Sequence, residues 1–234
     1  MIAIIAAMEK ELKTILDAMD ISEIVTISDK ILYIGMMKNK EVIVAKSGIG
    51  KVNAAITTTI LCLNYEIDFI INTGVAGGLF PVNTGEIVLS EAVTYFDVNV
   101  INIDPELSFG QIPGDSFLVK ADEKLVSFAK SIFDDMKFDY RIGIIASGDQ
   151  FITDSQTLKP IQKIVENLLA VEMESMAVAV AASKFNIPFI IIRGISDVID
   201  DTLQVQIYEN SVDDIAGMTA HFVIRFVEEY HWTR

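Results

Sequence analysis

Hydrophobic positions along this chain form short apolar runs that alternate with stretches of helical spacing. Residues 2–7 are apolar throughout, as in a strand buried on both faces, and residues 8–19 then carry apolar side chains at helical spacing. This succession recurs to the end of the chain. Further strands are expected at about 23–28, 31–37, 41–46, 67–72, 85–94, 140–146, just before Glu172 and at 189–192. Further helices are expected at about 52–63, 122–133, 156–167, 176–185 and 205–230.

The alternation of strands and helices predicts an α/β fold with a mixed, mostly parallel central sheet flanked by helices. No repeat, linker or low-complexity tract divides the 234 residues, so we expect a single domain over 1–234. Residues 96–118 lack any period, and a loop of this length is usually functional or shared with a partner. The 52–63 helix is apolar around much of its girth, which is typical of a helix in the core or in a subunit interface.

The charge balance narrows the choice of partners. The chain has 18 basic and 33 acidic residues, a net charge of −15, which repels nucleic acid and anionic membrane surfaces, so neither is expected as a partner. Cys62 is the only cysteine, which excludes an internal disulfide and fits a reducing compartment. No stretch approaches the roughly 18 uninterrupted apolar residues of a membrane span. We expect a soluble, cytoplasmic protein.

Charged and glycine-rich segments follow several of the predicted strands. Glu172, Met173 and Glu174 close one strand, and the segment from Arg193 to Asp197 closes another. Open α/β sheets place ligands at the carboxyl ends of their strands, so these charges are expected at a binding edge. A plainer interpretation is one structural ion pair between Glu172 and Arg193 beside a solvated loop, and this stretch alone leaves both open. Glycine-rich segments also follow strands at 47–51, 73–78 and 147–152.

Several kinds of chemistry are excluded by motifs that the chain lacks. The 47–51 turn superficially resembles a phosphate loop, but Val52 stands where the Walker motif requires Ser or Thr, and Asn53 replaces the third glycine of the dinucleotide fingerprint. The two histidines, His221 and His231, occur without a Gly-x-Ser-x-Gly elbow, and no His/Cys cluster has metal-ligand spacing. We expect neither a metal nor a cofactor.

Carboxylates near glycine-lined strand ends remain as the candidate chemistry. Two carboxyl groups in different environments can serve as general acid and general base around an oxocarbenium-like transition state, as in cleavage of a glycosidic bond. A third carboxylate can hold sugar hydroxyls, because those hydrogen bonds strengthen as positive charge develops on the ring.

Six segments, in this order and register, resemble the bacterial 5′-methylthioadenosine/S-adenosylhomocysteine nucleosidases of the nucleoside phosphorylase superfamily. The resemblance extends over essentially the whole chain, and six blocks together are far more specific than any one of them. The segments are AMEKE at 7–11, KSGIGK at 46–51, NTGVAGG at 72–78, SGDQFI at 147–152, VEME at 171–174 and RGISD at 193–197.

The resemblance implies a role for each matching residue. Glu11 would be the base that polarises the attacking water, and Asp197, aided by Ser196, would be the acid that protonates the purine at N7. The substrate would be a small adenosine thioether, and its N-glycosidic bond would be hydrolysed to adenine and a 5-thioribose product. The remaining residues expected to bind the substrate are Met8, Ile49 and Ile207 near the 5′-alkylthio group, Ala76 and Gly77 beside base and water, Phe151 and Ile152 at adenine, Met173 and Glu174 at ribose, and Glu172 with Arg193.

The resemblance also implies a homodimer. In such enzymes the partner subunit supplies part of the 5′ pocket from the long loop, here about residues 100–113, and an apolar 52–63 helix would suit that interface. The sequence departs from the family pattern in two places. Val75 stands where many relatives have Ser. The 96–113 loop is slightly longer than in a known relative, so the residues of the 5′ pocket cannot be assigned one by one.

The basic residues favour water over phosphate as the nucleophile. A phosphate is best held by bidentate Arg side chains, yet no arginine precedes Arg141, and Lys46 and Lys51 are weaker substitutes. Three alternatives stay open: a phosphate-dependent purine nucleoside phosphorylase, a hydrolase acting on aminofutalosine, and a non-catalytic nucleoside-binding module. Three converging carboxylates argue against the last.

Overall fold

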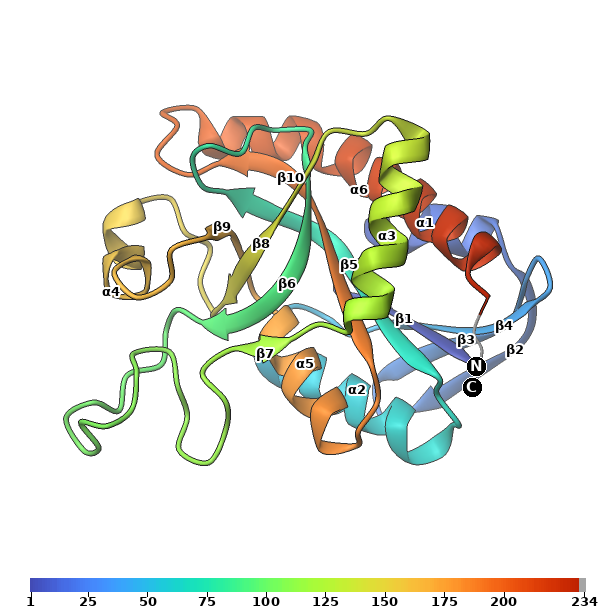
Figure 1. The fold of residues 1–234 in the computed structure, drawn as a ribbon. Helices are drawn as coiled ribbons and strands as arrows, with labels where there is room; N and C mark the ends of the chain where they lie inside the picture. The colour runs from blue at the N-terminus through green and yellow to red at the C-terminus, as the bar shows by residue number, and fades with distance from the viewer. Residues whose placement is uncertain (232–234) are drawn as a thin grey trace.

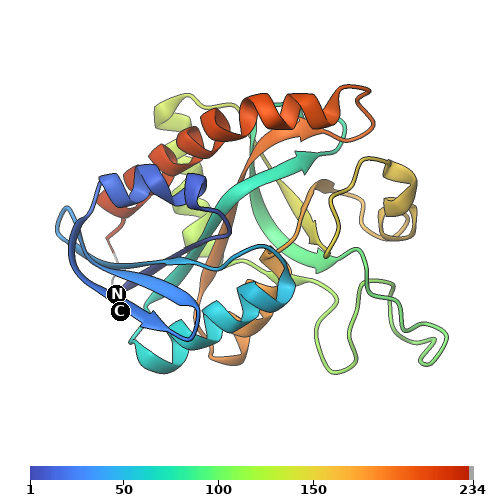
Figure 2. The same cartoon turned by 180° about the vertical axis from the view of Figure 1, so that it is seen from behind.

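A computed structural model of the chain, which describes residues 1–231, contains one ten-stranded mixed sheet with helices against both faces (Figures 1 and 2). The strands are β1 (Ile2–Ala6), β2 (Asp20–Ile27), β3 (Lys30–Met37), β4 (Lys40–Lys46), β5 (Phe69–Gly78), β6 (Ile87–Tyr95), β7 (Val119–Lys120), β8 (Tyr140–Ser147), β9 (Leu168–Glu172) and β10 (Phe189–Val198). The helices are α1 (Glu9–Asp17), α2 (Lys51–Asn64), α3 (Glu123–Met136), α4 (Lys159–Gln162), α5 (Ser175–Lys184) and α6 (Gln204–Glu229), with a 3₁₀ turn at Ser155–Leu158.

The sheet closes on itself at one end. Strands follow the order β10-β6-β8-β9-β5-β1-β4-β3-β2, and β10 also pairs with β5, so that β5, β10, β6, β8 and β9 form a ring. The expected α/β class with a mixed sheet is confirmed. Parallel pairing is less dominant than expected, because five of the ten pairings among the described residues are antiparallel, including those of the β2-β3-β4 meander.

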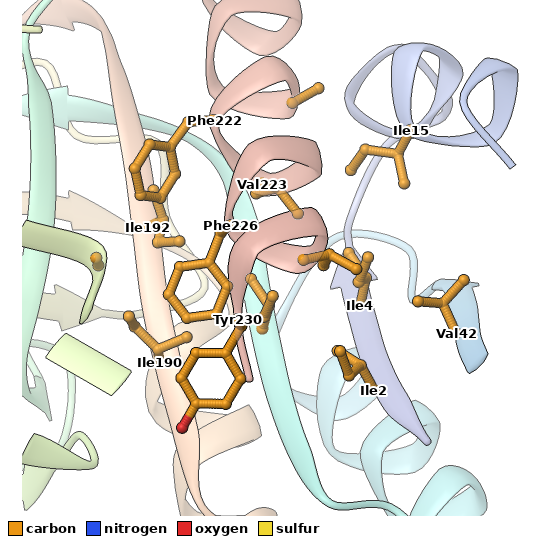
Figure 3. Packing of buried hydrophobic residues seen from close by; sticks show 14 of the residues in the cluster. Ile2, Ile4, Ile15, Val42, Ile190, Ile192, Phe222, Val223, Phe226 and Tyr230 are labelled. Carbon is orange, nitrogen blue, oxygen red and sulfur yellow. The ribbon is translucent and has the colours of Figure 1, made fainter. Parts of the chain in front are cut away.

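Alternate residues of the central strands pack against the helices on opposite faces. Ile2 and Ile4 of β1 belong to the cluster beneath α1, α3 and α6, whereas Ala3 and Ile5 face α2 and α5. Figure 3 shows the first cluster, in which Phe226 of α6 is fully buried. Burial of a side chain of that size contributes about 1.5–3 kcal/mol, so these helices are held mainly by their apolar faces.

Three neighbouring parallel strands bring distant segments to one edge of the sheet. β1 pairs with β5 and β5 pairs with β10, and all three run in the same direction. The residues after β1 and those in the last turns of β5 and β10 therefore lie side by side. A β-bulge between Ile195 and Asp197 leaves Ser196 without a partner on β5. Such a bulge changes the direction of the neighbouring side chains, and here the side chains of Ser196 and Asp197 both lie at this edge of the sheet.

The structure corrects several sequence-based boundaries. β5 continues through the glycine segment to Gly78, and β10 continues to Val198, because the two strands pair along their whole length. Arg193 and Asp197 thus lie inside a strand and not in a loop after it. The expected 156–167 helix is wrong: the chain forms a 3₁₀ turn and the four-residue α4, with Pro160 in its first turn, where its missing N–H costs nothing. The two-residue β7 was not expected.

Candidate active site

A cavity of about 260 Å³ lies at the edge where β1, β5 and β10 end. Twelve of the fourteen residues expected at the site line it, namely Met8, Glu11, Ile49, Ala76, Gly77, Phe151, Ile152, Glu172, Met173, Glu174, Ser196 and Asp197. Arg193 and Ile207 are not among the lining residues. Arg193 is buried beneath the cavity, where it binds Glu172, and the side chain that α6 presents to the cavity is that of Tyr208.

Glu11 is held in the cavity wall by backbone groups of two separate elements. It is the third residue of α1, and its carboxylate accepts hydrogen bonds from the N–H of Met8 (2.8 Å) and the N–H of Val75 in β5 (3.1 Å). Gly74 is required here, because a Cβ at that position would lie 2.6 Å from Glu11 Oε1. Burial raises the pKa of Glu11, while the charge of Arg193 and these hydrogen bonds oppose the rise.

Asp197 is buried, and two neutral donors hold its carboxyl group. The Ser196 hydroxyl donates to Oδ1 at 2.6 Å, and the side-chain amide of Gln204 donates to Oδ2 at 2.7 Å. Burial raises the pKa of Asp197, and the two hydrogen bonds lower it by less. The net upward direction is the one that a general acid working near neutral pH requires.

Glu174 differs from its neighbour Glu172 in its partners. Oε1 of Glu174 accepts the N–H of Gly50 (2.7 Å), which ties the glycine turn before α2 to the start of α5. Gly50 can present this N–H because its φ of 96° suits glycine. Burial, and then the nearby charge of Glu172, raise the pKa of Glu174 to about 8. The raised pKa favours the protonated form of Glu174, which can donate as well as accept a hydrogen bond.

Glu172 is committed to structural partners. Its carboxylate binds Arg193 Nη2 at 2.7 Å and accepts the N–H groups of Glu174 and Ser175 at the start of α5. Burial alone would raise the pKa of Glu172, but Arg193 and these hydrogen bonds lower it below its usual value. The structural ion pair considered from the sequence is thus present. Glu172 lines the cavity and Arg193 lies behind it, and the segment around the pair is buried strand and helix start, not solvated loop.

Two residues at the site could not be recognised in the sequence. Gln204, the first residue of α6, is bonded to Asp197, and Tyr208 lines the cavity one turn later. The Tyr208 ring meets Phe151 edge to face, with centroids 5.4 Å apart, and its hydroxyl lies 4.0 Å from Met8 Sδ. Which of the adjacent residues Ile207 and Tyr208 faces the cavity depends on the rotation of α6 about its axis. That rotation is set by how the helix packs and cannot be read from the sequence.

No group of three or more His, Cys, Asp or Glu side chains in residues 1–231 is arranged to hold a metal ion. The same part of the chain has no helix that is both long and apolar enough to cross a membrane. What the cavity offers is four buried carboxyl groups, of which that of Glu172 is paired with Arg193, together with a glycine-lined strand and a half-exposed aromatic ring. These groups suit proton transfer to and from a small, uncharged organic ligand.

Comparison with known proteins agrees with this geometry. The family model of the phosphorylase superfamily matches residues 1–228. A 5′-methylthioadenosine/S-adenosylhomocysteine nucleosidase of Bacillus cytotoxicus is 39% identical over 233 residues, which cover 97% of this chain and 98% of the relative. The nucleosidase of the same name from Neisseria meningitidis, solved with methylthio-immucillin-A, superposes with a TM-score of 0.92 at 31% identity over 98% of this chain and 99% of that one.

A futalosine hydrolase of Helicobacter pylori is also similar, with a TM-score of 0.91 and 28% identity over 98% of this chain and 97% of that one. The fold alone therefore does not separate the two activities. The identity to the Bacillus relative and the superfamily match over nearly the whole chain do establish the family. The chain belongs to the phosphorylase superfamily and, within it, to the family of the 5′-methylthioadenosine/S-adenosylhomocysteine nucleosidases.

Proposed function

We propose that this protein hydrolyses the N-glycosidic bond of 5′-methylthioadenosine and S-adenosylhomocysteine, releasing adenine and the 5-thioribose product. The observation that carries the proposal is the meeting of Glu11, Glu174 and Asp197 around one cavity, although α1, the start of α5 and β10 are far apart in sequence. Relatives at 39% identity bear the name of this activity. Three converging acids have no evident use in a protein that only binds nucleosides.

Protonation of the leaving group is the first requirement of the reaction. A purine leaves poorly as an anion, so a proton delivered to N7 as the bond breaks lowers the barrier. Asp197 is the residue suited to this step, because burial keeps its proton in place to higher pH, while Ser196 and Gln204 are positioned to stabilise the carboxylate that remains. The half-exposed ring of Phe151 would stack on the base, and the backbone of Ile152 would bind its Watson–Crick edge.

Activation of water is the second requirement. Glu11, once ionised, can orient a water molecule and take its proton as the sugar becomes cationic. Its negative charge near the ring also stabilises the oxocarbenium-like transition state. Glu174, whose pKa is raised by burial and by the charge of Glu172, would hold the ribose hydroxyls, with Met173 packed against the sugar. Val75 contributes only its N–H, to Glu11, where many relatives could offer a Ser hydroxyl.

The basic side chains near the cavity are already neutralised. Lys51 Nζ binds Asp97 at 2.6 Å and lies 3.7 Å from Asp149, Lys46 pairs with Glu9 at 3.8 Å, and Arg193 pairs with Glu172. The lining residues include no Lys, Arg or His. A phosphate dianion would meet acidic groups with no free cation to balance them, which supports water as the nucleophile.

An adenine-release assay tests the proposed function. The protein is incubated with methylthioadenosine, adenosylhomocysteine or aminofutalosine, each with and without inorganic phosphate. We expect adenine and a free 5-thio sugar from the first two, at rates that phosphate does not change. Formation of a ribose 1-phosphate would instead identify a phosphorylase. A strong preference for aminofutalosine would support the second candidate, for which the similarity to the Helicobacter futalosine hydrolase speaks.

We further propose that the protein is a homodimer and, from its charge and single cysteine, that it is cytoplasmic. An apolar groove of about 290 Å³ runs between α2, α5 and the loop after β6, lined by Val52, Ala55, Val98, Ile112 and Val180. The loop projects from the body of the molecule beside α5 (Figures 1 and 2). Val52 is 69% exposed, and an apolar face of this kind is typical of a subunit interface.

The oligomeric state is open to a direct measurement. Sedimentation should give twice the chain mass, and Val52→Glu should shift the protein toward monomer and lower its activity, because a buried unpaired charge opposes association and the partner loop would complete the 5′ pocket. Ile24→Glu is the matched control, since Ile24 is 60% exposed on β2, which contributes no residue to the groove. A monomeric wild-type protein with full activity would contradict the proposal.

A further inference from the structure

Gln204 connects two parts of the site that come from different elements. The side chain starts α6 and is 3% exposed. Its Nε2 donates one hydrogen bond to Asp197 Oδ2 at 2.7 Å and another to the carbonyl oxygen of Ile152 at 2.8 Å. Both hydrogens of the amide group are therefore used, one on the candidate acid and one on the backbone beside the cavity.

The orientation of this amide follows from the chemistry of its partners. The Ile152 carbonyl can only accept a hydrogen bond, so a flipped amide would place two acceptor oxygens against each other. Gln204 Oε1 has no hydrogen-bond partner in residues 1–231, so the contacts of Nε2 decide the orientation. Asp197 therefore faces a fixed donor whether it is protonated or ionised. A donor of this kind favours the ionised state, because hydrogen bonds to a charged group are the stronger ones.

We propose that Gln204 is a positioning residue for the hydrolysis, an inference that rests on the proposed function. It holds the Asp197 carboxyl group and the Ile152 carbonyl at one separation, and it stabilises the carboxylate that forms when Asp197 gives up its proton. In adenine the N6 amino group lies between N1, on the Watson–Crick edge, and N7. The Gln204 amide can thus fix the position of Asp197 at N7 relative to that of the Ile152 backbone at the Watson–Crick edge of the same purine.

None of the other groups that face Asp197 can take over the hydrogen bond that Gln204 donates to it. Ser196 on β10 donates to the opposite carboxyl oxygen, and Gly77 on β5 adds no charge. Glu11, Glu172 and Glu174 line the same cavity from α1, β9 and the start of α5, and Tyr208 lines it from α6. The lining residues include no cationic side chain that could replace the lost donor. Without Gln204 the carboxyl group should keep its proton to higher pH.

The test replaces Gln204 by methionine, which has a similar length and no donor. Gln206→Met is the matched control, because Gln206 is exposed on the same helix. Adenine release from methylthioadenosine is followed against pH. We expect kcat/KM to fall about tenfold or more in Gln204→Met, and its alkaline limb to move to higher pH by about one unit, as for loss of one hydrogen bond to a carboxylate. Gln206→Met should match the wild type.

A shape change alone would lower the rate without moving the alkaline limb, so an unmoved limb overturns the proposal. Gln204→Glu provides a second test if the methionine variant does not fold. It preserves the shape, and its charge opposes ionisation of Asp197, so the limb should again move to higher pH. A wild-type protein that releases no adenine defeats the proposed function. An active wild type with Gln204 variants of normal rate and pH profile defeats this inference alone.

Discussion

Asp197→Asn is expected to lower kcat/KM for methylthioadenosine by a factor of 10² or more, the range usual for loss of a general acid. Asparagine has nearly the same shape: its oxygen can keep the bond from Gln204, and its NH2 can donate to the Ser196 hydroxyl, which has the Ala76 carbonyl as another acceptor. It has, however, no acidic proton for N7. The loss should appear in the bond-breaking step, measured as adenine formed in a single turnover. Asp213→Asn is the control, because the Asp213 side chain is 79% exposed and forms an ion pair with Lys10 at the surface.

The pH dependence gives this prediction a second readout. Asp197 acts in its protonated form, and its pKa is raised, so wild-type activity should persist to higher pH than an ordinary aspartate would allow and then fall as pH rises through that pKa. In Asp197→Asn this alkaline limb should be absent from the residual activity. Near-normal turnover, or an unchanged limb, would show that another group protonates the purine.

Glu11→Gln is expected to reduce turnover to a comparable degree while leaving ligand binding largely intact. The amide oxygen can still accept from Met8 or Val75, so the start of α1 and β5 should keep their arrangement. What is lost is the negative charge and the ability to take a proton from water. Titration calorimetry with adenine, beside the adenine-release rate, separates binding from chemistry. Glu9→Gln, two residues earlier and exposed on α1, is the control.

The sign of the pH effect is opposite for this residue. Glu11 acts in its ionised form, and burial raises its pKa, so wild-type activity should rise with pH through that value. Together with the alkaline limb from Asp197, the rate should pass through a maximum. In Glu11→Gln the acid limb should disappear. Retention of the acid limb and of normal turnover would mean that water is activated elsewhere, with Glu174 as the next candidate.

The apolar pattern alone predicted most of the elements correctly, because burial on two faces or on one stripe leaves a local period. It predicted β1, α1, α3 and α6 to within a few residues. It failed where strand pairing determines the length of an element. β5 and β10 extend beyond their apolar runs because each supplies backbone hydrogen-bond partners to the other. The 156–167 segment has a helical pattern, yet it packs as a 3₁₀ turn and a short helix against its own small cluster.

For the site, the sequence by itself determined which chemistry was available: Glu11, Glu174 and Asp197 in family-specific segments, and no arginine cluster for phosphate. Only the tertiary structure decided how those groups are set to act. The bulge at Ser196, the reach of Gln204 from α6 and the commitment of Glu172 to Arg193 all join residues that are far apart in the chain or depend on strand register. Burial and neighbouring charge are properties of that assembled environment, and they set the protonation of each carboxyl group.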